Sequence, residues 1–216
     1  MRLIPRPILN WVNGVVTEID FDTVASGTVV NHKYSGVTLN AVRLLNQSPG
    51  ANFGSVYASD RYDVRGADTP LNAVTISKPP QLAGFDETGG GIQVTFSSPQ
   101  LYVSIDAHPI ITGGDPRNPN TNRPYMMVFG VPIKLIPPAQ LPPVQIATVS
   151  LPTLSMNPNH FETWQTLDFV STSARPNIGS VIFSSSNSGY GASVYALFDR
   201  LRFAHHLPLT ATLKEG

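Results

Sequence analysis

The carboxylate of Asp199 stands out because its position conflicts with its polarity. Residues 193–203 read as a β-strand, and in two-residue alternation Asp199 shares a face with large apolar residues. These are Tyr195, Leu197, Leu201 and Phe203. A carboxylate on such a face is costly to bury unless it is hydrogen-bonded, paired with a cation or bound to a metal ion. The pattern leaves three roles open: accepting backbone N–H bonds, pairing with an arginine, or binding a metal.

Three further carboxylates follow at two-residue spacing near the start of the chain. Glu18, Asp20 and Asp22 fall on one face of a strand-like segment at 15–22 and alternate with residues that are mostly apolar. A face of this kind is ordinarily solvated. The spacing alone therefore indicates no site.

Aromatic rings are the next candidates, because a flat apolar ring suits the face of a pyranose sugar. Trp164 alternates with Glu162 and Thr166, which places it on the more polar face of its strand. Tyr190 lies in the Ser- and Gly-rich segment 184–192, where a loop would present its ring outward. Most aromatic residues of a β-sandwich belong to the core, so both rings are ligand-binding candidates beside that ordinary role.

The usual catalytic patterns are missing from the sequence. It has no cysteine and five histidines, and it contains neither a His-Glu-x-x-His pair, a Gly-x-Ser-x-Gly elbow nor a Gly-x-x-x-x-Gly-Lys phosphate loop. His205 and His206 are adjacent and would face opposite sides of a strand, so a metal pair there is not expected. Two acids for glycoside hydrolysis cannot be recognised without their spatial separation. The sequence predicts a protein that is not an enzyme.

The amino-acid composition limits the classes of partner that the protein can be expected to bind. Charged residues make up 13% of the 216 residues, with 14 basic and 14 acidic side chains, against the roughly 25% of an average protein. No basic cluster is available for a nucleic acid, and no apolar run approaches a membrane span. A near-zero net charge favours association. We therefore expect protein partners and a homo-oligomer.

The pattern of apolar residues has a period of two almost everywhere, which predicts strands. The strand-like runs are 15–22, 36–42, 73–77, 92–96, 101–107, 125–135, 144–151, 163–170, 178–184 and 193–203. Turn residues separate them, among them Ser48-Pro49-Gly50 and Gly89-Gly90-Gly91. No segment has a helical stripe with caps. The predicted fold class is all-β, a jelly-roll β-sandwich of two antiparallel sheets closed by the last strand lying beside the first.

We divide the chain into an N-terminal arm at 1–15, a sandwich at 16–204 and a C-terminal tail at 205–216. Within the sandwich, 108–124 is a predicted long polar loop, and 132–152 is a proline-rich segment expected at an edge or in an extended arm. The N-terminal segment contains Pro5, Pro7 and Asn10 where a secretory signal needs an unbroken apolar stretch. No signal peptide is expected.

Three groups of residues resemble the sequence pattern of a known class of β-sandwich. They are Ile19-Asp20-Phe21-Asp22 with Tyr34-Ser35-Gly36-Val37-Thr38-Leu39, then Val103-Ser104-Ile105-Asp106-Ala107, and finally Phe198-Asp199-Arg200-Leu201-Arg202-Phe203. Over about residues 16–204 the chain resembles the carbohydrate-binding-module-like jelly rolls, a group also seen in bacteriophage decoration and tail proteins. Leu39 and Arg200 depart from the more usual Phe and Asn of that pattern.

The resemblance implies a site and two functions. Such jelly rolls often hold a structural Ca²⁺ between the first and last strands, which would make Asp199, Asp22 and Asp20 its carboxylate ligands, completed by backbone carbonyls. The function we expect first is a structural or adhesive module of a virion or similar assembly. The alternative is a calcium-stabilised carbohydrate-binding module of a surface or secreted protein. The expected location is a virion or an extracellular surface.

Overall fold

The computed structural model describes residues 16–45, 48–59, 73–75, 90–111, 124–131, 143–150, 164–173, 175–185 and 194–206. Within these ranges the regular structure consists of strands, and no helix is long and apolar enough to cross a membrane. The strands are β1 (Thr17–Ile19), β2 (Val37–Leu45), β3 (Ser48–Gly54), β4 (Tyr57–Ser59), β5 (Ala73–Thr75), β6 (Gly90–Gln100), β7 (Tyr102–Ile111), β8 (Pro124–Gly130), β9 (Gln145–Ser150), β10 (Gln165–Val170), β11 (Ile178–Ser185) and β12 (Val194–Ala204).

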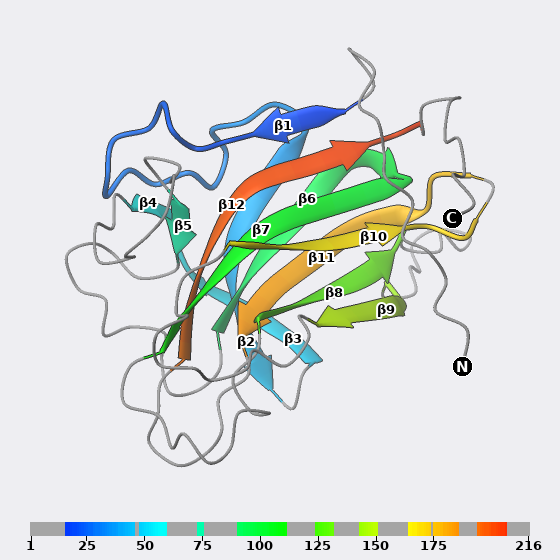
Figure 1. Ribbon diagram of the computed structural model, residues 1–216. Helices are drawn as coiled ribbons and strands as arrows, with labels where there is room; N and C mark the ends of the chain where they lie inside the picture. The colour runs from blue at the N-terminus through cyan, green and yellow to red at the C-terminus, as the bar shows by residue number, and fades with distance from the viewer. Residues whose placement is uncertain are drawn as a thin grey trace, which may run out of the picture.

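The strands form two antiparallel sheets that pack face to face (Figure 1). Sheet A has the order β10-β7-β12-β5-β4, with β1 also paired to β12, and sheet B has the order β3-β2-β6-β11-β8-β9. Strands β6, β7 and β8 follow each other in the chain but alternate between sheets B, A and B, as in a jelly roll. The predicted fold class, an all-β jelly-roll β-sandwich of two antiparallel sheets, is confirmed.

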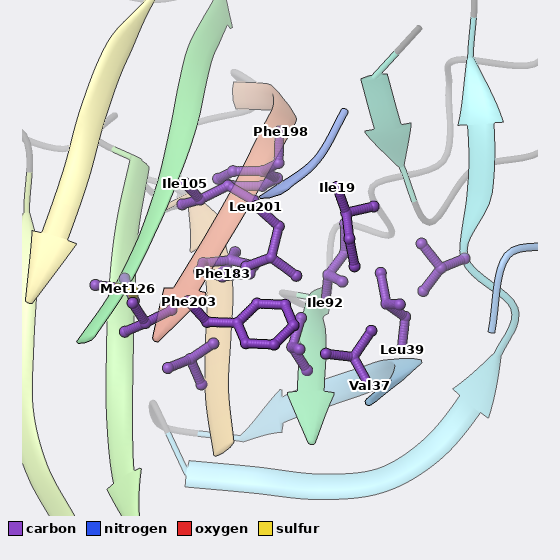
Figure 2. Packing of buried hydrophobic residues seen from close by; sticks show 14 of the residues in the cluster. Ile19, Val37, Leu39, Ile92, Ile105, Met126, Phe183, Phe198, Leu201 and Phe203 are labelled. Atoms are coloured by element: carbon purple, nitrogen blue, oxygen red, sulfur yellow. The ribbon is translucent and has the colours of Figure 1, made fainter. Parts of the chain in front are cut away.

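The core lies between the sheets and is built from the apolar residues of alternating positions (Figure 2). Phe183 of sheet B and Phe198 of sheet A are fully buried, with ring centroids 5.6 Å apart. Phe96 and Phe203 make a second contact between the sheets at 5.2 Å. Aromatic pairs at such distances add about 0.5–1.5 kcal/mol beyond the area they bury, so they help to hold the two layers in one relative position.

The first and last strands lie side by side, as the sequence predicts. Thr17 of β1 is opposite Phe203 of β12, and Ile19 is opposite Leu201. The same edge of β12 is occupied by β5 at Phe198. Residues 199 and 200 therefore lie between the end of β1 and the short strand β5.

Strict alternation along β12 is wrong as a prediction. Phe198 and Leu201 are both buried in the core although they are three residues apart, and Arg200 between them is exposed. The reason is a register shift between Asp199 and Arg202 in the pairing of β12 with β7, where Arg200 has a φ of 48°. Such a bulge inserts one residue and reverses which parity points inward.

Two of the predicted turns and part of a predicted loop are strand instead. Ser48-Pro49-Gly50 opens β3, which is possible because β3 is an edge strand and Pro49 lies beside register shifts in its pairing with β2. Strand β6 already begins at Gly90. Strand β7 continues through Ile111, so residues 108–111 of the predicted loop belong to it, and 112–123 lie outside the described residues. The described end of the proline-rich segment is β9, at the edge of sheet B.

Strand β8 is buried on both faces. Met126 and Val128 belong to the core between the sheets, whereas Met127 and Phe129 belong to a separate apolar cluster on the outer face of sheet B. The members of this outer cluster are Val42, Met127, Phe129 and Ile182, with Tyr125 packed against them. Burial on two faces explains why the sequence of β8 is a continuous apolar run rather than an alternating one.

Candidate functional site

Asp199 is completely buried, and neither of its carboxylate oxygens accepts a hydrogen bond of normal geometry. Burial raises the pKa of Asp199 to about 8. The backbone N–H of Arg200 lowers it, and the nearby Asp22 and Asp106 carboxylates raise it further. Asp106 lies directly opposite Asp199 in the β12–β7 ladder, where like charges destabilise a sheet. The predicted conflict at Asp199 is therefore present, because the backbone N–H and the charge of Arg200 lower its pKa only in part.

A second unpartnered polar group, the Tyr34 hydroxyl, lies close to the same acids. It is buried and makes no hydrogen bond, while its ring packs edge-on against Phe21 with centroids 5.3 Å apart. Burial raises the pKa of Tyr34 to about 12, and the carboxylates of Asp20, Asp199 and Asp22 add to the rise. All three predicted metal ligands therefore lie near enough to Tyr34 for their charges to raise the pKa of its hydroxyl.

The backbone is unusual on both sides of this site. Phe21, fully buried between Asp20 and Asp22, has a φ of 60°, and Arg200, next to Asp199, has a φ of 48°. A bulky residue with positive φ is a real outlier that tertiary contacts must hold in place. The local turn is supported by a hydrogen bond of 3.3 Å that the Asp22 N–H donates to Oδ1 of Asp20.

The predicted ligands are only partly suited to hold a cation. Asp199 is buried and unpartnered, Asp22 is half-buried near it, and Asp20 is exposed. Among the residues that the structure describes, no three His, Asp or Glu side chains group closely enough to hold a metal ion by themselves. A Ca²⁺ ion takes 6–8 oxygen ligands. At this site Asp199 and Asp22 would have to be joined by backbone carbonyls.

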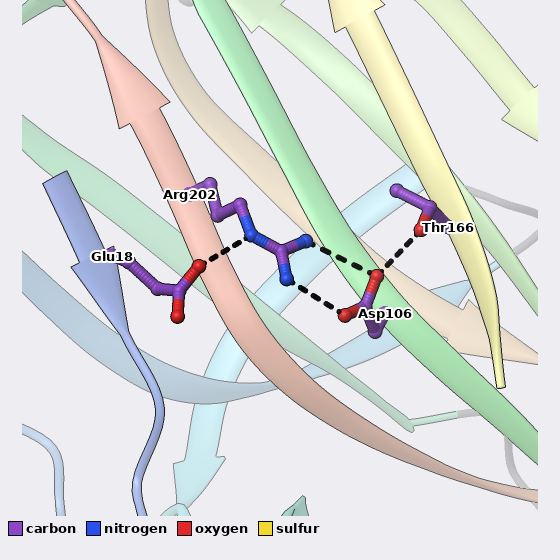
Figure 3. A network of polar contacts seen from close by, with 4 residues as sticks. All are labelled: Glu18, Asp106, Thr166 and Arg202. Carbon is purple, nitrogen blue, oxygen red and sulfur yellow. Dashed lines mark hydrogen bonds and ion pairs between the residues drawn. The ribbon is translucent and has the colours of Figure 1, made fainter. Parts of the chain in front are cut away.

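A row of polar contacts crosses four strands of sheet A (Figure 3). Arg202 of β12 donates to Asp106 of β7 through both terminal nitrogens, at 3.2 and 3.0 Å, and through Nε to Glu18 of β1 at 2.6 Å. Thr166 of β10 donates to the same Asp106 at 2.6 Å. We call these four residues the Arg202 row.

Neither arginine of β12 neutralises Asp199. Arg202 is bound to Asp106, and the two side chains are 16% and 13% exposed. Arg200, directly next to Asp199, is exposed, and its charge only partly offsets the rise in the pKa of Asp199. Burial alone would lower the pKa of Arg202, but its hydrogen bonds to Asp106 and Glu18 raise it above the ordinary value. Sequence reasoning missed the row, although Glu18 and Arg202 become direct neighbours once β1 is paired with β12.

Among the described residues, the other sequence candidates lie elsewhere in the fold. Trp164 is half-buried just before β10, and Tyr190 lies outside the described residues. His205 and His206 follow the end of β12, and their rings contact each other at 4.5 Å instead of facing opposite sides. Nδ1 of His205 lies 2.6 Å from the carbonyl oxygen of Pro99.

Comparison with known proteins adds no relative to this picture. No family model matches the chain, and no curated protein matches it. The resemblance to carbohydrate-binding-module-like jelly rolls consequently stays a prediction that the observed β-sandwich is compatible with.

Proposed function

We propose that this protein is a non-enzymatic structural or adhesive module that works as part of a larger assembly, such as the decoration or tail of a virion. The observation that carries the proposal is an exposed apolar corner where β8 meets β9. Val131, Val144 and Ile146 are 41%, 60% and 40% exposed there. They are close neighbours, since Val144 accepts a backbone hydrogen bond from Gly130 and the Ile146 side chain packs near Gly130.

This corner is unusual for a protein that functions alone. Single exposed apolar residues are common, but a grouped set at a sheet edge marks a surface that other proteins cover. Residues 143–150 contain no charged side chain. Natural proteins commonly protect exposed edge strands with charges, and this strand lacks them.

The perturbed carboxyl supports a structural role over a catalytic one. Among the acids that the structure describes, Asp199 has the strongly raised pKa, and it is fully buried in the sandwich. A catalytic acid must come within hydrogen-bond reach of its substrate. An acid closed off between strands cannot do so unless the fold opens.

Sedimentation of the purified protein tests the assembly proposal. We expect the average mass to rise between micromolar and millimolar concentration, and we expect co-sedimentation with virus particles if the gene lies among capsid or tail genes. Salt should change the association little, because the corner is apolar and not charged. A protein that stays monomeric throughout and binds no particle would contradict the proposal.

A second candidate function rests on a different observation, the unpartnered carboxylate of Asp199. As a calcium-stabilised carbohydrate-binding module, the protein would hold Ca²⁺ through Asp199 and Asp22 together with backbone carbonyls. The ion would supply the positive charge that the site lacks and fasten the first strand to the last. Trp164 would then be the described candidate for contact with a sugar ring.

Calcium binding is tested by titration calorimetry and chemical denaturation with Ca²⁺, with Mg²⁺ and with chelator. A saturating ion at about 100 times its Kd should stabilise the wild type by roughly 2.7 kcal/mol. Asp199→Asn should lose this gain, whereas Asp168→Asn, at an exposed carboxylate of β10, should keep it. An absence of heat and of stabilisation in the wild type would exclude the ion. A glycan array with and without chelator then tests sugar binding.

A further inference from the structure

We propose that two copies of this chain pair through β9, antiparallel and about a two-fold axis, so that sheet B continues from one copy into the other. The inference rests on the proposed assembly function and identifies β9 as the strand through which two copies make contact. It starts from the position of β9 at the end of sheet B, next to β8 (Figure 1). Within the described ranges, no strand pairs with the outer edge of β9.

The other edge strands are protected in the ways that proteins ordinarily use. Strand β3, at the opposite end of sheet B, contains Pro49, and β10 of sheet A carries the exposed Asp168. Strands β4 and β1, at the remaining edges of sheet A, are three residues long each. Proline, charge and shortness all oppose pairing with another chain. Strand β9 has six residues and none of these features.

The side chains of β9 alternate as a pairing strand requires. Ala147 and Val149 pack against the core, while Ile146, Thr148 and Ser150 are exposed. Thr148 lies opposite Met127 of the outer cluster, so the exposed residues continue the outer face of sheet B. A second β9 would extend the hydrogen-bonded ladder of sheet B and cover Ile146.

Charge identifies a second copy as the matching partner. A partner strand that carried charged side chains would bury them against β9, which has no opposite charge to compensate for the lost hydration. Residues 143–150 of a second molecule carry no charge, and the chain as a whole has a formal net charge of zero. Antiparallel pairing of a strand with itself is also the closed two-fold arrangement that most homodimers adopt.

The contact is small, which sets the expected strength. A strand of six residues is about 20 Å long, and an interface of this size is below the roughly 800 Å² per partner of a stable complex. We therefore expect a dissociation constant in the micromolar range or weaker for the isolated pair. In a particle, several such contacts would act together.

Substitution by lysine tests the pairing. Ile146→Lys places a charge on the paired edge, and we expect it to weaken dimerisation at least about tenfold in sedimentation equilibrium. Val29→Lys is the matched control, because Val29 is a similarly exposed apolar residue (49%) outside sheet B, and it should change the dimerisation constant less than about twofold. Thr148→Lys serves as a second variant if Ile146→Lys does not fold.

Cysteine cross-linking tests the geometry, and the chain has no cysteine of its own to interfere. Single cysteines at 146, 148 and 150 are oxidised alone and in pairwise mixtures. A two-fold antiparallel pair should cross-link strongly only in the combinations that one register places opposite each other, for example 148 with itself together with 146 and 150, because only directly opposed Cβ atoms lie close enough for a disulfide. Thr95→Cys, at an exposed site of the central strand β6, should cross-link slowly.

The outcomes separate this inference from the assembly proposal. A dimer that Ile146→Lys and Thr148→Lys leave unchanged, or cross-linking spread evenly over all positions, would overturn the β9 pairing while the assembly function stands. Binding to a particle by a protein that never self-associates would do the same. A monomer that binds nothing would overturn both.

Discussion

Asp199→Asn should make the protein more resistant to urea at pH 8 than the wild type in chelator-containing buffer. We expect the free energy of unfolding to rise by about 2–4 kcal/mol, because the variant removes a carboxyl that is ionised in the unfolded chain but costly to ionise in the fold. The gain is smaller than the full pKa shift implies, since the asparagine amide is also left without hydrogen-bond partners at this buried position.

The sign of the pH dependence follows from the raised pKa of Asp199. The folded-state pKa is about 8 and the ordinary value is 3.8, so between these values the unfolded chain releases a proton that the folded chain retains. The contribution of Asp199 to stability is therefore greatest below pH 4 and is lost progressively as the pH rises to about 8. Near pH 4 the variant and the wild type should differ little.

Urea denaturation at several pH values between 4 and 9 measures this effect directly. Asp168→Asn is the control, because Asp168 is an exposed acid of sheet A and should leave the pH profile parallel to that of the wild type. If Asp199→Asn were destabilising at pH 8, the Asp199 carboxylate would have a partner that stabilises its charge in the fold, which would contradict its raised pKa.

Arg202→Met is expected to lower the free energy of unfolding by about 2–4 kcal/mol at neutral pH. The methionine keeps much of the arginine's apolar length but leaves Asp106 as a half-buried carboxylate with one remaining donor, Thr166. Most of the loss should come from Asp106, because Glu18 is 48% exposed and an exposed ion pair contributes about 0–1 kcal/mol.

A double-mutant cycle separates the lost pair from other effects. Adding Asp106→Asn to Arg202→Met should recover part of the loss, because no unpaired charge is left behind. Arg175→Met, at an exposed arginine outside the strands, is the control and should change stability by less than about 0.5 kcal/mol. Equal losses for Arg202→Met and Arg175→Met would show that the Arg202 row adds nothing to the sheet.

The fold class could be predicted from sequence because the signal repeats in nearly every strand. Alternating apolar residues define most of the strands, and the core positions of β6 and β7 follow from alternation alone. In β11 a register shift between Ile178 and Ser180 interrupts the alternation. The pairing of β1 with β12 was predictable from the resemblance, in which the first strand lies beside the last. Asp199 is buried as expected, but the parity argument behind that expectation was wrong, because the register shift gives Phe198, and not Asp199, the inward direction of Leu201 and Phe203.

The parts that could not be predicted depend on interruptions of that pattern. Arg200 gives no signal that it will adopt a positive φ, so the register shift that turns both Phe198 and Leu201 inward is invisible in the sequence. Pro49 reads as a turn because proline is rare in strands, and only the edge position of β3 permits it. The ion pair between Asp106 and Arg202 could be predicted only with the strand order of sheet A, which alternation does not give.

The antiparallel pairing of β1 with β12 also determines how the sandwich would respond to mechanical tension. Thr17, at the start of β1, is opposite Phe203, close to the end of β12. The chain therefore enters and leaves the sandwich at the same end of the β1–β12 ladder. Pulling them apart would break that ladder one pair at a time, as in a zipper, and would not shear all of its bonds together. The Glu18–Arg202 ion pair follows directly after the first residue pair, Thr17 and Phe203. It would be the first strong interaction to resist separation of the two strands.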